Sequence, residues 1–217
     1  MGCAEAARLV VPLAAPRYTE GRLAASGAIP DSDSKETAMA LPPPVDALWN
    51  ELESIRADLL EEIGGLSQVQ ADWRPGERDW SIGEIVHHLV MAEVATGKLT
   101  SKLLKEAGTS APPFPAGLSR FPPLPPWPPG PAEAPPAVRP EEGHKIEELV
   151  GSLAAARERS RQSVERLATV DPRSLKWPHP RFGEYDLAQW WLLQARHDAD
   201  HLQQLRAVKA SPGFPRH

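Results

Sequence analysis

The chain has 217 residues, of which 41% are hydrophobic, and this is enough for one domain with a buried core. Its formal net charge is -5 with both signs interspersed, which gives little support to binding of nucleic acid or of an anionic membrane. No segment approaches about 18 consecutive apolar residues, so no membrane span is expected. The single cysteine, Cys3, excludes an internal disulfide and a thiolate metal cluster. We therefore expect a cytoplasmic protein.

The N-terminal segment does not read as part of a folded domain. Residues 1–38 mix Ala, Gly, Ser and charged residues without sustained apolar periodicity, which is typical of a disordered extension. Met39 is followed by Ala-Leu-Pro-Pro-Pro and then by a clear amphipathic pattern. We hypothesise that the natural chain starts at Met39, and we predict that one domain spans residues 39–212.

The first two helices are predicted from apolar spacing and boundary residues. Apolar residues recur at three- and four-residue steps over 45–63, which indicates an amphipathic helix that ends at a Gly-Gly pair. The second helix is predicted to begin at Ser81, because Ser81 and Glu84 form a capping box, and to run to about residue 107.

The last two helices are predicted in the C-terminal part of the chain. The third covers 141–169, where the apolar spacing is again helical and an Asp-Pro pair follows. The fourth begins at Asp186, an N-cap residue with Gln189 three positions later, and runs to about residue 210. Because no segment shows strand-like alternation, we predict an all-α fold.

A proline-rich segment separates the second helix from the third. Residues 112–140 hold 13 of the chain's 25 prolines, which is typical of an extended, polyproline-like spacer. Such a spacer can span the length of a bundle, roughly 30–40 Å, and so allows these two helices to run parallel. Its aromatic residues Phe114, Phe121 and Trp127 indicate that it is anchored on the bundle. A lid over a site and a Pro-x-x-Pro ligand for a partner domain are the alternatives.

Three histidines form the candidate site. His197 and His201 are four residues apart in the fourth helix, so both imidazoles can reach one metal ion. On an ideal helical wheel His201 lies inside the apolar stripe and His197 at its edge. In the second helix His88 is better placed than His87 to face a crevice, and His87 is expected to face solvent. Antiparallel packing of the two helices would bring His88 to the level of the pair.

Two ordinary explanations compete with a metal site. His197 and His201 could be exposed helix residues, as in most His-x-x-x-His pairs. Alternatively, His201 could be a core histidine that is hydrogen-bonded to a neighbour. The candidate neighbours are Asp198, Gln194 and Gln204.

Two stretches of the chain resemble the DinB-like (DinB/YfiT) superfamily of metalloenzymes. Residues 80–93 carry a Trp-Ser start, a His-Leu pair and a glutamate, and residues 179–204 carry His-Pro-Arg-Phe-Gly, a Trp and the His-x-x-x-His pair. The resemblance covers about 45–210. It implies a four-helix bundle in up-down-down-up order, with a Pro-rich crossover at about 108–140 between parallel second and third helices. This crossover is longer than is usual in the family.

The resemblance also implies a divalent metal ion held by His88, His197 and His201. Imidazole ligands suit zinc or nickel, with iron or manganese as alternatives. Three protein ligands leave open positions, where the metal can activate a water or bind a thiol. We therefore expect a metal-dependent hydrolase or thiol S-transferase that acts on a small molecule, including a low-molecular-weight thiol. Neither nucleic acid nor a membrane is expected as a partner. The sequence leaves the oligomeric state open, and a homodimer is the commonest closed assembly.

Glu93 is the candidate catalytic residue beside the metal ligands. It follows His88 by five residues and could serve as an acid/base or as a positioning partner, although an exposed helix residue is the simpler interpretation. Asp200 and Gln204 flank the ligand pair and could orient an imidazole through its other nitrogen. The alternative to an enzyme is a non-catalytic metal-binding or interaction protein, whose metal site is structural or vestigial.

Overall fold

The computed structural model describes residues 40–128 and 133–216. The residues from Leu41 onward form one compact unit, which contains the bundle and the candidate site. The extension predicted to be disordered and the proposed start at Met39 lie outside the described residues.

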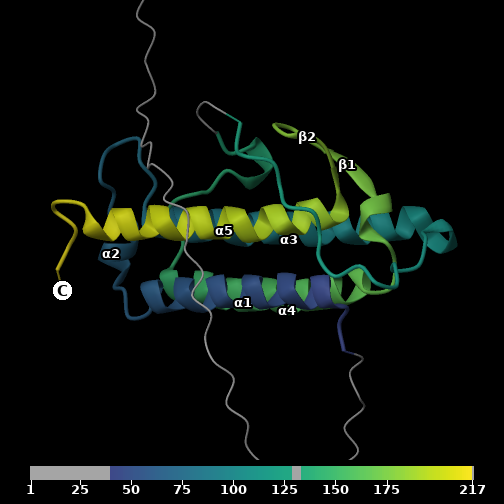
Figure 1. Cartoon of the computed structure of the whole chain (residues 1–217). Coiled ribbons are helices and arrows are strands. Elements are labelled where there is room, and N and C mark those ends of the chain that lie inside the picture. The colour runs from purple at the N-terminus through teal and green to yellow at the C-terminus, as the bar shows by residue number, and fades with distance from the viewer. Residues whose placement is uncertain (1–39, 129–132, 217) are drawn as a thin grey trace, which may run out of the picture. The chain divides into compact units, whose positions relative to one another are not determined.

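Four long helices form a bundle (Figure 1). They are α1 (Pro43–Ile63), α3 (Ile82–Ala107), α4 (Ile146–Leu167) and α5 (Leu187–Ala210). A short helix, α2 (Gln68–Asp72), lies between α1 and α3 and was not anticipated from the sequence. Three single 3₁₀ turns complete the helical elements: η1 (Gly108–Ser110), η2 (Pro136–Val138) and η3 (Pro172–Ser174). The predicted four-helix bundle is confirmed.

The described residues also contain a small β-hairpin that the sequence analysis did not predict. Strand β1 (Lys176–His179) pairs antiparallel with β2 (Gly183–Asp186), and Trp177 faces Tyr185 across the pair. Each strand has four residues, which is too short for polar–apolar alternation to stand out in the sequence. The expectation that no strand interrupts the helices was therefore wrong at this point.

The direction of each helix follows from contacts between helix ends. The Asp171 backbone N–H, just beyond α4, donates to the Pro112 carbonyl, just beyond α3, at 2.8 Å. The C-terminal ends of α3 and α4 therefore lie together, so these helices are parallel. At the opposite end, Lys209 of α5 contacts the Glu62 carboxylate of α1 at 2.6 Å, so α1 and α5 are also parallel. The up-down-down-up order with parallel second and third long helices is confirmed.

Two apolar clusters hold the bundle together, one toward each end. The first joins the start of α5 to the ends of α3 and α4, through buried residues such as Trp191, Leu103 and Leu167. The second joins the start of α3 to the end of α5, for example Ile85 with Leu205. Both clusters require α3 and α5 to be antiparallel. The polar side chains of the candidate site lie between them.

Helix boundaries match the sequence signals at most ends. Ser81 with Glu84 and Asp186 with Gln189 form the expected capping boxes, in which each side chain bonds the other residue's backbone N–H. The predicted third helix begins later than expected, at Ile146, because Gly143 has a φ of 82° that a right-handed helix cannot contain.

The proline-rich crossover packs on the bundle, as its aromatic residues predicted. Phe121 is buried in the first apolar cluster and Phe114 packs against it. Farther along, the η2 turn brings the Val138 carbonyl against α3. Within the described part of the chain, no helix combines the length and apolar character that a membrane span requires.

Candidate metal centre

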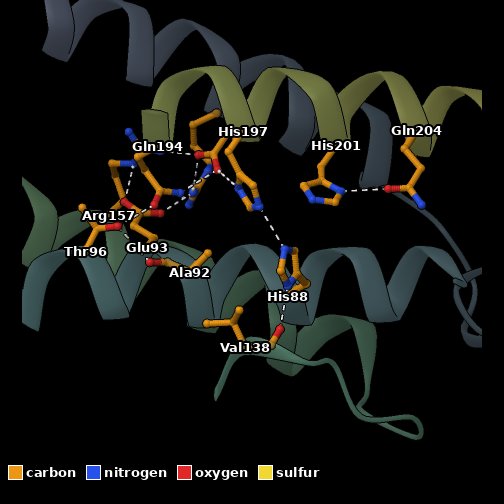
Figure 2. A network of polar contacts seen from close by, with 12 residues as sticks. His88, Ala92, Glu93, Thr96, Val138, Arg157, Gln194, His197, His201 and Gln204 are labelled. Carbon is orange, nitrogen blue, oxygen red and sulfur yellow. Dashed lines mark hydrogen bonds and ion pairs between the residues drawn. The ribbon is translucent and has the colours of Figure 1, made fainter. Parts of the chain in front are cut away.

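Three histidines converge between α3 and α5 (Figure 2). His88 lies in the second turn of α3, a helix whose start is set by the Ser81 capping box. His197 and His201 project from successive turns of α5 toward α3. One potential ligand atom from each of the three lies within 4.8 Å of the others. The predicted convergence is confirmed. His201 is also hydrogen-bonded to Gln204, as the second ordinary explanation expected.

The three rings form a compact triangle. The centroids of His88 and His197 are 4.9 Å apart, those of His88 and His201 4.8 Å, and those of His197 and His201 4.5 Å. The Nε2 atoms of His88 and His197 are 2.9 Å apart. Nitrogen ligands about 2.0–2.1 Å from a tetrahedral zinc lie roughly 3.3 Å from one another, so a small adjustment of these rings accommodates an ion.

The outward-facing nitrogens determine the tautomers of two rings. Nδ1 of His88 lies 2.6 Å from the Val138 carbonyl oxygen, which can only accept, so Nδ1 carries the proton and donates. Nδ1 of His201 lies 2.8 Å from Oε1 of Gln204 and donates in the same way. In the neutral rings Nε2 of both histidines is then unprotonated. Both lone pairs face the centre of the triangle, as metal ligation requires.

The third ring has a different outer neighbour. Nδ1 of His197 is buried, makes no hydrogen bond among the described residues, and lies 3.6 Å from Oδ1 of Asp198. With no metal, Nε2–H of His197 can donate to Nε2 of His88. With a metal at the centre, the proton would sit on Nδ1, where the Asp198 carboxylate stabilises it. The donor set therefore fits a divalent cation.

Burial keeps the three imidazoles neutral. It is the largest cause that lowers the pKa of His88 to about 4, and the neighbouring His197 adds to it. Burial likewise lowers the pKa of His197 to about 4 and that of His201 to about 3. Neutral imidazole is the form that binds metals. The site is thus in its ligating protonation state at neutral pH.

Trp80 forms one wall of the triangle. Its ring stacks on His201 at a centroid distance of 5.9 Å and an interplanar angle of 16°, and it lies 5.0 Å from the ring of His88. The indole excludes water from one side and restricts both imidazoles. The sequence showed Trp80 only as part of a motif, and nothing in it indicated that the Val138 carbonyl would orient His88.

Glu93 does not join the histidines and is not an exposed helix residue. Its side chain is 1% exposed and lies 2.5 Å from Nη2 of Arg56 and 3.1 Å from Nε of Arg157. The same two guanidinium groups lie 3.8 and 3.6 Å from Oδ2 of Asp198. Glu93 is therefore linked to the metal centre indirectly, through the two arginines and Asp198 next to His197. The simpler interpretation of Glu93 as a surface residue was wrong.

The buried charges form a neutral cluster of two arginines and two carboxylates. Gln194 completes it by donating to Oδ1 of Asp198 at 2.7 Å, and its own Oε1 accepts from the Thr96 hydroxyl at 2.9 Å. Burial raises the pKa of Asp198, and the charges of Arg56 and Arg157 oppose this rise. Neither arginine was predicted from the sequence, because a charged residue at a core-facing helix position has no local signature.

The remaining candidates have separate places. Gln204 orients His201, as expected. Asp200 instead accepts a hydrogen bond from the Trp127 side chain in the crossover. His87 is only partly exposed, because its ring lies 4.0 Å from that of His144 and its Nδ1 accepts from the Glu141 N–H. Its predicted solvent-facing position is therefore only partly right.

Known proteins resemble this chain over the same region. The family model described as the DinB superfamily matches residues 51–205, which is more than half of the chain. The chain belongs to the DinB superfamily. It is also 24% identical over 157 residues to the uncharacterized protein YuaE of Bacillus subtilis (strain 168), and the match covers 71% of this chain and 92% of that protein.

A solved structure shares the fold. The crystal structure of TT2238, described as a four-helix bundle protein, matches with a TM-score of 0.52 and 22% sequence identity. The match covers 75% of this chain and 98% of the other. The family resemblance inferred from the histidine motifs is thus confirmed, and the fold is that of a four-helix bundle.

Proposed function

We propose that this DinB superfamily protein is a divalent-metal-dependent enzyme whose metal ligands are His88, His197 and His201. The convergence of three neutral imidazoles from two antiparallel helices carries the proposal. Two of them already have their Nδ1 protons directed outward, to the Val138 carbonyl and the Gln204 side chain. Zinc or nickel suits such a nitrogen donor set, with iron or manganese as alternatives.

The metal, when bound, would supply Lewis-acid activation of a water or of a thiol. A hydrolase of this kind usually also needs a carboxylate base beside the metal, as in proteins where a glutamate performs general base catalysis. Here both Glu93 and Asp198 lie against Arg56 and Arg157, so neither is a free base. This pairing favours thiol S-transfer over hydrolysis, because a metal-bound thiol ionises without a strong base.

The competing explanation is a metal ion with a purely structural role. The apolar packing of the bundle argues against this role. Each of the two apolar clusters on either side of the histidines contains buried residues from all four long helices. A metal that only held the bundle together would be expected where the apolar core is insufficient. We therefore assign the metal to chemistry on a small molecule, with a low-molecular-weight thiol as the first substrate to test.

The test is elemental analysis of the purified protein beside its His88→Ala and His201→Ala variants, after incubation with zinc or nickel. We expect about one metal ion per chain in the wild type and its loss in both variants, with circular dichroism unchanged. Thiol transfer and hydrolysis are then assayed on the loaded protein. A wild-type protein that takes up neither metal would overturn the proposal.

A second measurement separates a catalytic from a structural metal. If the metal is catalytic, His201→Ala should abolish turnover and leave the melting temperature close to that of the metal-free wild type. A collapse of the melting temperature in the variant, well below that of the metal-free wild type, would instead support a structural role. The homodimer and the cytoplasmic location stay predictions, which size-exclusion chromatography and fractionation can test.

A further inference from the structure

Two polar groups beside the metal centre are buried and unused. The Tyr185 side chain in β2 is 3% exposed, and its hydroxyl has no hydrogen-bond partner in the described structure. Nε and Nη2 of Arg196 in α5 are likewise buried and make no hydrogen bond to any described residue. Buried polar groups are nearly always paired, because an unpaired one loses its hydration without compensation. An ordered water or a ligand supplies the missing partner of such groups.

A chain of ring contacts links the two groups. The guanidinium of Arg196 lies 4.1 Å over the ring of Trp127, and Trp127 lies 4.9 Å from Phe182. Phe182 in turn stacks on Tyr185 at 5.7 Å with an interplanar angle of 19°. Figure 1 shows the two covering segments, the crossover and the β1–β2 hairpin, side by side over α5. The charge of Arg196 also acts on Tyr185, lowering a pKa that burial raises.

His179 extends this chain of ring contacts. The ring of His179 stacks on Phe182 at 4.4 Å and lies 6.1 Å from Tyr185. Arg196 itself directly precedes the metal-ligand candidate His197 on α5. The orphaned guanidinium therefore lies beside the metal centre along α5.

The free edge of Arg196 has the geometry of a carboxylate receptor. Nη1 already donates to the Pro125 carbonyl at 2.8 Å, which fixes the guanidinium on the crossover. Nε and Nη2 remain, and these two N–H groups form the fork that binds both oxygens of a carboxylate. The Tyr185 hydroxyl can donate a third hydrogen bond. Burial raises the pKa of Asp200, one turn along α5, while its bond from Trp127 and the charge of Arg196 oppose this rise. No ion pair within 4 Å joins Asp200 and Arg196 in the described structure.

We propose that Arg196 and Tyr185 form a subsite for a carboxylate of the substrate, beside the three-histidine centre. This proposal rests on the proposed function, since it makes the substrate an anionic, carboxylate-bearing small molecule. The crossover around Pro125 must lift from α5 to admit the ligand, because it covers these atoms in the ligand-free protein. If Arg196 only anchored the crossover, its Nη1 bond to the Pro125 carbonyl would be enough. The Tyr185 hydroxyl would then have no role.

The first arm of the test uses cobalt-loaded protein and two thiols that differ only in charge. N-acetylcysteine carries a carboxylate, and N-acetylcysteine amide carries a neutral amide in its place. Thiolate-to-cobalt absorption gives the dissociation constant of each. We expect the carboxylate to bind about tenfold more tightly or better, as a charged hydrogen-bond pair provides. Arg196→Gln and Tyr185→Phe should each reduce this preference without weakening the amide.

Arg206→Gln is the matched control for charge. It removes an arginine from the same helix, one that pairs with Glu62 on the other side of the bundle, and it should keep the full preference. Tyr185→Phe is the matched control for folding, since its lost hydroxyl has no partner and its melting temperature should not fall. Equal affinities of the two thiols in the wild type, or a preference that survives in both site variants, would overturn the proposal.

The second arm needs neither metal nor thiol. Thermal-shift titration of the wild type with N-acetylglycine should raise the melting temperature more than its neutral amide does, and Tyr185→Phe should remove the difference. If neither thiol binds cobalt but this difference is present, the thiol-transfer function fails and the carboxylate subsite stands. If the thiols bind and no carboxylate preference appears in either arm, the subsite fails and the proposed function stands.

Discussion

Nε2 of His88 and Nε2 of His197 lie 2.9 Å apart, although 109 residues separate them in the chain. Nδ1 of His88 donates to the Val138 carbonyl, so Nε2 of His88 is unprotonated and carries a lone pair. Only a proton on His197 or a cation can therefore lie between the two Nε2 atoms. The pair is thus held together either by one hydrogen bond or by a shared metal ion.

Loss of Gln204 should weaken metal binding without unfolding the protein. Its Oε1 accepts from Nδ1 of His201 at 2.8 Å, which orients the ring and keeps Nε2 unprotonated. Outer partners of this kind typically contribute about 10–100-fold to metal affinity. We expect Gln204→Ala to lower zinc affinity by about that factor in a competition titration with a chromophoric chelator. Gln203→Ala, an exposed neighbour on the same helix, should leave the affinity unchanged.

Replacing Glu93 should destabilise the fold strongly, because Glu93 compensates two buried arginines. Glu93→Gln keeps the volume but leaves Arg56 and Arg157 with one carboxylate, Asp198, between them. Breaking a buried ion pair in this way costs about 3–5 kcal/mol. We expect a loss of that order in the free energy of unfolding, measured by urea denaturation.

Glu53→Gln is the matched control for Glu93→Gln. Glu53 lies 3.6 Å from Arg157, but its side chain is 47% exposed, so its loss should cost less than about 1 kcal/mol. If Glu93→Gln instead kept full stability and lost only turnover, Glu93 would be a catalytic acid or base and not a structural ion-pair partner.

The metal-free protein should lose stability as the pH falls below about 6.5. Folding lowers the pKa of His88 from 6.5 to about 4, so the folded state binds fewer protons than the unfolded state between these values. The stabilising contribution is complete above pH 6.5 and is lost as the pH falls toward 4. A shift of this size corresponds to roughly 3 kcal/mol for one histidine, and His197 and His201 act in the same direction.

Urea denaturation of metal-free protein at several pH values measures this dependence. His88→Gln removes one titrating group and should have a shallower fall in unfolding free energy between pH 6.5 and 4. A constant stability of the wild type across this interval would contradict the neutral, desolvated state of the triangle. Added zinc should shift the fall to lower pH, because zinc competes with protons for the same lone pairs.

The first apolar cluster should depend on one buried hydrogen bond. The Trp191 indole N–H donates to the Thr100 hydroxyl at 2.9 Å, and neither residue is exposed. Thr100→Val keeps the shape but leaves the indole N–H unpaired, at a cost of about 1–3 kcal/mol. Thr100→Ser retains the hydroxyl and should retain the indole bond, losing only the packing of a methyl group. Thermal unfolding of the two variants, with Thr100→Val the lower, checks the prediction.

Local sequence signals predicted the four long helices of this protein but not helix α2 or the β1–β2 hairpin. Ser81 and Asp186 were recognisable as N-caps, because a capping box involves residues three apart in the chain. The β1–β2 hairpin was missed, since four-residue strands carry almost no periodic signal. The late start of α4 depends on the backbone conformation at Gly143, which the apolar spacing does not reveal.

The sequence by itself determined the four long helices, their order and the pair His197 and His201, because each depends on spacing along one segment. The length of the crossover also indicated that the helices on either side of it, α3 and α4, are parallel, because a chain that returns along the bundle must span its length. The tertiary structure decided what surrounds the triangle: the Val138 carbonyl on His88, and the orphaned Arg196 fork beneath the crossover. These groups come from distant segments, and only packing of the folded chain brings their atoms within hydrogen-bonding range.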